Sequence, residues 1–144
     1  MNKIFKAYEM NAFATSNGFS PTSRGCPRGF AVIESCLAAN EPALLCWCAE
    51  NISYLDGEKN YSKAAFALTP KRLICSGKTG AGYSAETLPV SDVTGAAAGR
   101  RRLFARPEAI IYTKSGSIKF ACADRDAAEA LAENIGKVLF SGTD

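Results

Sequence analysis

The sequence feature that most constrains the fold is a change in hydrophobic period near residue 43. Before that point apolar residues recur at helical spacing, whereas from 43 to 122 they alternate within short segments. Clusters of glycine, proline, asparagine, aspartate and serine separate these segments. Short, regularly spaced strands of this kind are typical of an antiparallel barrel or sandwich. The sequence therefore predicts a mainly β protein.

About seven strands are expected from this alternation. They are predicted at residues 43–52, 64–69, 72–75, 83–88, 93–97, 107–113 and 117–122. Turns are predicted at 56–60, 70–71, 76–80 and 115–116, where glycine, proline and small polar residues gather. The stretch 99–106 is predicted as a further strand with an arginine-rich edge.

An amphipathic helix is predicted after the last strand. Its apolar positions recur at 3-4-3 spacing and are Ala128, Leu131, Ile135 and Val138. Asp124 or Asp126 is expected to cap it, and Glu129 stands at capping-box spacing from Asp126. A lone helix with one apolar face is expected to fill an open end of the barrel.

The first 42 residues predict a short helical segment in front of the strands. A helix is expected over 3–14, a loop over 15–29, and a second helix over 30–37. Pro42 prevents that second helix from continuing. This part is followed directly by the change of period, so the chain is interpreted as one β domain with a helical lead.

Composition excludes several classes of active site. The chain has 144 residues, enough for one domain, and contains no histidine. Ser-His-Asp and Cys-His nucleophile arrangements are therefore excluded, as are His-ligated metal and haem sites. The formal charge of +3 is too weak to indicate nucleic-acid binding by itself. No cofactor and no metal are predicted.

Six cysteines are expected to serve as small apolar core residues. The closest pair, Cys46 and Cys48, forms a C-x-C and not the C-x-x-C of redox or zinc sites. In a strand both sulfurs would face the same side. The charged N-terminus is followed by no apolar run of about 7–15 residues, and no stretch has the roughly 20 apolar residues of a membrane span. A cytoplasmic location, with reduced thiols, is the resulting expectation.

The order of residues resembles bacterial pleckstrin-homology (PH)-like domains of the YokE-like kind. The similar segments are Leu37–Glu41 with Ala43–Cys48, the run Leu68-Thr69-Pro70-Lys71-Arg72-Leu73-Ile74, and the run Leu88-Pro89-Val90-Ser91-Asp92-Val93-Thr94. A hairpin with a glycine turn and a final helix complete the pattern, which covers residues 30–140. Arginines at 100–102 depart from the more neutral stretch expected there.

The resemblance implies a PH-like antiparallel barrel of about seven strands, capped by one C-terminal helix. It divides the chain into an N-terminal extension, 1–29, and a PH-like domain, 30–141. It implies no catalytic residues, because PH-like barrels are binding or scaffold modules. The Thr69–Ile74 run is interpreted as structural: Thr69 bonds the turn, and Lys71 and Arg72 keep the edge soluble.

The basic residues are the remaining candidates for ligand binding. The segment 76–82 has the glycines of a phosphate loop, but Arg72 stands where that motif needs its first glycine, so a nucleotide site is not predicted. Residues 99–119 carry a local charge excess of +5, which suits an anionic partner. The candidate ligand-binding residues are Arg100, Arg101, Arg102, Arg106 and Lys114, with Lys59 and Lys63 as secondary candidates.

Two functional hypotheses follow. The first is a non-enzymatic PH-like module that binds a protein partner or itself, with exposed strand edges and the extra N-terminal segment as its surface. The alternative is a peripheral binder of anionic lipid or of a phosphorylated ligand at the membrane surface, using the basic run at 100–102. A thiol-dependent enzyme is a third, weaker hypothesis, because it requires a cysteine of depressed pKa.

Overall fold

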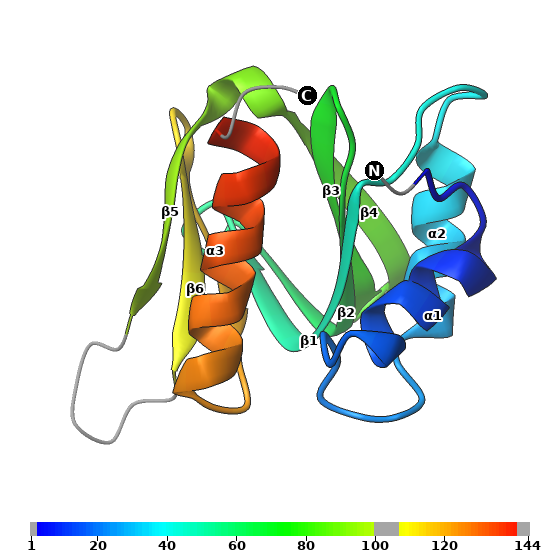
Figure 1. Ribbon diagram of the computed structural model, residues 1–144, viewed down its shortest axis with the longest axis horizontal. Helices are drawn as coiled ribbons and strands as arrows, with labels where there is room; N and C mark the ends of the chain where they lie inside the picture. Colours follow the sequence, from blue (N-terminus) through cyan, green and yellow to red (C-terminus); the bar gives the residue numbers. More distant parts are fainter. Residues whose placement is uncertain (1–2, 100–106, 141–144) are drawn as a thin grey trace.

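A computed structural model describes residues 3–99 and 107–140, and it contains a curved antiparallel sheet with helices on both sides (Figure 1). The helices are α1 (Ala7–Ser16), α2 (Pro27–Cys36), the short 3₁₀ helix η1 (Val90–Asp92) and α3 (Arg125–Phe140). The strands are β1 (Leu45–Tyr54), β2 (Lys59–Leu68), β3 (Arg72–Thr79), β4 (Gly82–Pro89), β5 (Val93–Gly99), β6 (Glu108–Thr113) and β7 (Gly116–Ala121).

The seven strands form one sheet in the order β4-β3-β2-β1-β7-β6-β5. The two edge strands, β4 and β5, follow each other in the chain and are joined by η1, so the sheet curls into an open barrel. Helix α3 lies along β5 and β6 and faces the interior of the curved sheet (Figure 1). On the other side α2 packs on β2, β3 and β4, and α1 packs on α2 and β1. The predicted α+β class, with seven antiparallel strands and a C-terminal helix, is confirmed.

Strand β1 is buried on both of its faces. Leu45 and Trp47 point into the core that α3 helps to fill, together with side chains from all seven strands. Cys46 and Cys48 point the other way, into a second core shared with α1 and α2. This double burial explains why residues 43–49 are almost continuously apolar instead of alternating. It also confirms that the two C-x-C sulfurs face the same side.

Small residues on the outer face of the sheet let α2 approach closely. A Cβ added at Gly29 would lie 2.8 Å from the Cβ of Ala65 and 3.1 Å from the Oγ of Ser76. The Ser76 hydroxyl donates a hydrogen bond of 2.8 Å to the Gly29 carbonyl, which anchors the helix to β3. Helix α2 runs across residue 29, the position at which the chain was predicted to divide, and that division stays a prediction.

Several predicted boundaries are wrong by a few residues. Helix α2 begins at Pro27, inside the predicted loop, because proline suits the first position of a helix. Strand β3 continues to Thr79 through the predicted turn at 76–80, and β2 already begins at Lys59. Pairing of β2 with β3 extends to Ser62 and Lys78, so hydrogen bonding between strands outweighs the local turn signal.

The C-terminal helix begins as one of the two predicted caps requires. The Asp124 carboxylate accepts a hydrogen bond of 2.8 Å from the backbone N–H of Ala127. The predicted capping box between Asp126 and Glu129 is wrong, since Asp126 lies inside the first turn and Glu129 pairs with Arg125 at 3.1 Å. The buried positions of the predicted apolar stripe are Ala128, Leu131 and Ile135.

Replacing Gly77 with alanine is expected to destabilise the sheet by about 1–3 kcal/mol. A Cβ there would lie 2.8 Å from the carbonyl oxygen of Ser62 and 3.1 Å from the Cα of Ala64, at the irregularity where β2 bulges against β3. Backbone atoms this close cannot move aside cheaply. Chemical denaturation followed by fluorescence measures the change. Gly80→Ala is the matched control, because no atom lies within 4 Å of its added Cβ. Equal stability of the two variants would contradict the tight contact.

Candidate functional site

The predicted ligand-binding residues are not gathered at one site in the described part of the chain. Arg100, Arg101, Arg102 and Arg106 lie outside the described residues. Lys59 pairs with Glu86 at 3.1 Å, which neutralises its charge. Lys114 lies in the turn between β6 and β7, where its backbone N–H donates to the Asp92 carbonyl. Lys63 is exposed on β2 and lines a cavity described below.

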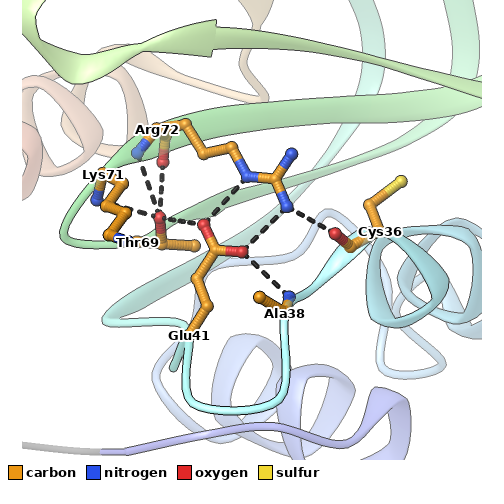
Figure 2. Close-up of polar contacts among 6 residues, drawn as sticks. All are labelled: Cys36, Ala38, Glu41, Thr69, Lys71 and Arg72. Carbon is orange, nitrogen blue, oxygen red and sulfur yellow. Dashed lines mark hydrogen bonds and ion pairs between the residues drawn. The ribbon is translucent and has the colours of Figure 1, made fainter.

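A partly buried ion pair fastens the loop after α2 to the start of β3 (Figure 2). The guanidinium of Arg72 donates from Nε and Nη2 to the two carboxylate oxygens of Glu41, each at 2.8 Å. The same carboxylate accepts from the Thr69 hydroxyl at 2.9 Å and from the Ala38 backbone N–H at 3.0 Å. Arg72 also donates to the Cys36 carbonyl. We call Glu41, Thr69 and Arg72 the Glu41 lock.

The Glu41 lock is structural. The side chain of Glu41 is 7% exposed, and hydrogen bonds from Arg72 hold its pKa at about 2 despite the opposing effect of burial. Thr69 accepts backbone N–H bonds from Lys71 and Arg72, as its predicted turn role requires. The prediction that Arg72 is a solvated edge charge is wrong, since Glu41 lies 31 residues away in sequence and only the fold places the two together.

A groove of about 710 Å³ lies between the N-terminal segment and the outer face of the sheet. We call it the N-terminal groove. Its lining residues are Pro21, Thr22, Arg24, Gly25, Cys26, Pro27, Arg28, Cys48, Ala49, Glu50, Ser62, Lys63 and Tyr83. They come from the loop between α1 and α2, the first turn of α2, and strands β1, β2 and β4. The predicted candidate Lys63 is the member that sequence analysis had singled out.

One wall of the N-terminal groove is shaped by Asn11 of α1. Its side-chain amide donates to the Arg24 carbonyl at 3.0 Å, and its oxygen accepts from the Cys26 backbone N–H at 2.8 Å. Between them Gly25 has a φ of 71° and passes so close to Asn11 that a Cβ would lie 2.2 Å from its oxygen. The loop is therefore held in one conformation by hydrogen bonds and by a glycine that no larger residue can replace.

The opposite wall is formed by a bulge in β2. Register shifts between Ser62 and Ala65, and Lys63 has a φ of 46°, which is unusual for a residue with a side chain. The Cys26 thiol donates a hydrogen bond of 2.6 Å to the Lys63 carbonyl, which ties the two walls together. The Arg28 guanidinium carbon lies 4.6 Å from the centre of the Tyr83 ring, a cation–π distance.

Sequence analysis missed Arg24 and Arg28. Both stand in the segment 15–29, which was interpreted as a loop, and neither was singled out as a ligand-binding residue. Two arginines four residues apart, around the glycine and proline at 25 and 27, were the available signal. This signal did not identify a site, because the packing of α1 and α2 on the sheet was not predicted.

The other open surface is the edge of β5. Within the described residues β5 pairs with β6 alone, and α3 packs against it from the inside. On the outer face of the neighbouring strand β6, Ile110 is partly exposed and Tyr112 is 45% exposed. Gly95 lies opposite Tyr112 and Gly99 lies next to Ile110, so small residues of β5 leave these two apolar side chains uncovered.

Four of the six thiols lie in surroundings that disfavour the thiolate. Burial raises the pKa of Cys48 to about 12 and also raises the pKa of Cys26, Cys46 and Cys75 above the usual thiol range. The described residues contain no group of three or more His, Cys, Asp or Glu side chains placed to hold a metal ion. None of the helices over 3–99 and 107–140 has the length and apolar character needed to cross a bilayer.

No protein-family model and no curated protein matches the sequence. Among solved structures, the chain is similar to the C-terminal domain of an unknown protein from Leishmania infantum. The two share 15% sequence identity with a TM-score of 0.48, and the match covers 70% of this chain and 87% of that one. A likeness this remote carries no information on function.

Proposed function

We propose that the protein is a non-catalytic binding and scaffold module that associates with a second copy of itself through strand β5. The observation that carries this proposal is the edge of β5, which among the described residues has a partner strand on one side only. An edge strand presents a row of backbone donors and acceptors that suits another strand. Two copies of β5 related by a two-fold axis run antiparallel, so each offers the other the same surface.

The composition of β5 supports self-association through this strand rather than through the other edge strand, β4. Its sequence, VTGAAAG, has no charged residue and no proline, which are the usual means of blocking edge pairing. Strand β4 carries Glu86 and Pro89, and its Tyr83 lies under Arg28. The apolar side chains of Ile110 and Tyr112 lie on the strand next to β5 and would lose exposed area in such a dimer.

A non-catalytic role is supported by the chemistry of the described residues. The four thiols with raised pKa are poor nucleophiles, which weakens the hypothesis of a thiol-dependent enzyme. With no histidine in the chain, the Ser-His-Asp and Cys-His nucleophile arrangements are excluded. The alternative, binding of anionic lipid through residues 100–102, stays a prediction, because those arginines lie outside the described residues.

Size-exclusion chromatography with light scattering is expected to give a mass of about twice 15.3 kDa at micromolar concentration. Ala97→Lys places a charge in the middle of β5 and is expected to return the protein to the monomeric mass. Thr87→Lys is the matched control, because it adds the same charge to an exposed position of the other edge strand. A monomeric wild-type protein at every concentration, or equal effects of both variants, would refute association through β5.

A further inference from the structure

We propose that the N-terminal groove is a binding site for a small organic anion, one that joins a carboxylate, sulfonate or phosphate group to a flat apolar body. The site is separate from β5 and does not depend on self-association. Its volume of about 710 Å³ lies within the range of about 300–1,000 Å³ that is usual for small-molecule sites.

The groove is built before any ligand arrives. Asn11 fixes the loop on one side through its two hydrogen bonds, and the Cys26 thiol bonds across to the Lys63 carbonyl on the other. Beneath it, the close contact of Gly29 with Ala65 keeps α2 seated on the sheet. A site whose walls are already ordered loses little conformational entropy on binding, so its contacts contribute more fully to affinity.

The charged side chains that line the groove favour a negatively charged ligand. Three cationic side chains line the groove, Arg24, Arg28 and Lys63, against one carboxylate, Glu50. Within the described part of the chain, none of the three cations forms an ion pair with an acidic side chain. Unpaired cations around a concave surface concentrate the positive potential there and attract an anion. The planar fork of an arginine also suits the oxygens of a carboxylate, sulfonate or phosphate group.

The uncharged residues that line the groove favour a ligand with a flat, apolar body. Pro21, Pro27 and Ala49 supply apolar surface, and the Tyr83 ring supplies an aromatic one. The Arg28 guanidinium lies over that ring at a cation–π distance, so a positive charge stands directly beside the aromatic surface. An inorganic ion would leave the apolar surface wet, whereas an uncharged apolar molecule would leave the cations without a partner. The two kinds of surface together therefore select a molecule that carries both kinds of group.

The probe pair that tests this is 8-anilinonaphthalene-1-sulfonate and its uncharged analogue N-phenyl-1-naphthylamine, which share nearly the same aromatic body. Fluorescence titration of the folded protein is expected to show saturable binding of one sulfonate probe per chain. The uncharged analogue is expected to bind more weakly, by roughly tenfold, because it lacks the charged contact. Raising the salt concentration to about 0.5 M is expected to weaken binding of the sulfonate probe but not of the uncharged analogue, because salt screens exposed charges.

The double variant Arg24→Gln and Lys63→Gln is expected to lower the affinity for the sulfonate probe by roughly tenfold. It is expected to leave the affinity for the uncharged analogue unchanged. Both side chains are exposed, so the variant is expected to keep the thermal midpoint of the wild type. The control variant, Lys71→Gln with Lys114→Gln, removes the same charge from exposed sites outside the groove. Equal weakening by both double variants, or no saturable binding to the folded wild type, would overturn the proposal.

Discussion

Truncation of the chain after Ala123 is expected to abolish cooperative folding. The removed helix α3 carries Leu131 and Ile135, whose side chains are fully buried against β5, β6 and β1. Burial of each stabilises the fold by about 1.5–3 kcal/mol, and further apolar surface on α3 packs on the same core. A domain with a stability of about 5–15 kcal/mol cannot lose this helix and keep the curved sheet closed over a dry core.

Single substitutions in α3 test the same expectation on a protein that still folds. Leu131→Ala is expected to lower the free energy of unfolding by roughly 2–5 kcal/mol, through lost burial and the cavity left behind. Denaturant titration followed by the fluorescence of Trp47, which lies in the same core, measures it. Glu133→Ala on the exposed face of α3 is the control and is expected to change stability by about 0.5 kcal/mol at most. A soluble truncated protein with an unchanged thermal midpoint would show that α3 is a detachable arm.

Replacing Arg72 with methionine is expected to destabilise the protein by roughly 3–5 kcal/mol. The change removes three hydrogen bonds of the Glu41 lock, two to the carboxylate and one to the Cys36 carbonyl. It leaves a buried carboxylate without its cation, and the cost of that uncompensated charge dominates the effect. Denaturant titration at neutral pH measures it. Lys71→Met removes the adjacent, exposed charge and is expected to be nearly neutral.

The pH dependence of folding stability provides a second test of the Glu41 lock. The folded-state pKa of Glu41 is lowered to about 2, so this group contributes stability that is fully present above its ordinary pKa near 4.5. That stability is lost as the pH falls from about 4.5 to about 2. The difference between the wild type and Arg72→Met is therefore expected to shrink over this interval. A constant difference, or full stability of Glu41→Leu with Arg72 unchanged, would show that the ion pair does not hold the loop.

The Glu41 lock illustrates why part of the structure was beyond sequence analysis. The run Thr69–Ile74 was recognised as a turn, and the role of Thr69 is confirmed by its two backbone hydrogen bonds. The partner of Arg72 was not predicted, because Glu41 belongs to a loop that the fold alone brings near. A basic residue in a turn is normally solvated, so no local pattern pointed to a carboxylate partner for Arg72.

The candidate sites, too, were only partly predictable from the sequence. Lys63 was singled out from its sequence, but the groove that gives it a context depends on Arg24 and Arg28, which come from a segment interpreted as a loop. The edge of β5, which has no second partner strand within residues 3–99 and 107–140, depends on which strands are neighbours. Strand order follows from the pairing of β1 with β7, between segments about 65 residues apart, and local patterns carry no signal for such a contact.

The sequence by itself determined the elements and one side of the core. Period-two alternation, together with the apolar run that starts at residue 43, identified seven strands between turn signals. The 3-4-3 spacing identified α3 and its buried stripe, because that spacing lines one side of a helix. Tertiary structure decided the second core, in which Cys46, Cys48 and Ala65 meet α1 and α2. Small apolar residues fit either a solvent-facing or a helix-covered surface, so only the packed chain shows which of the two they form.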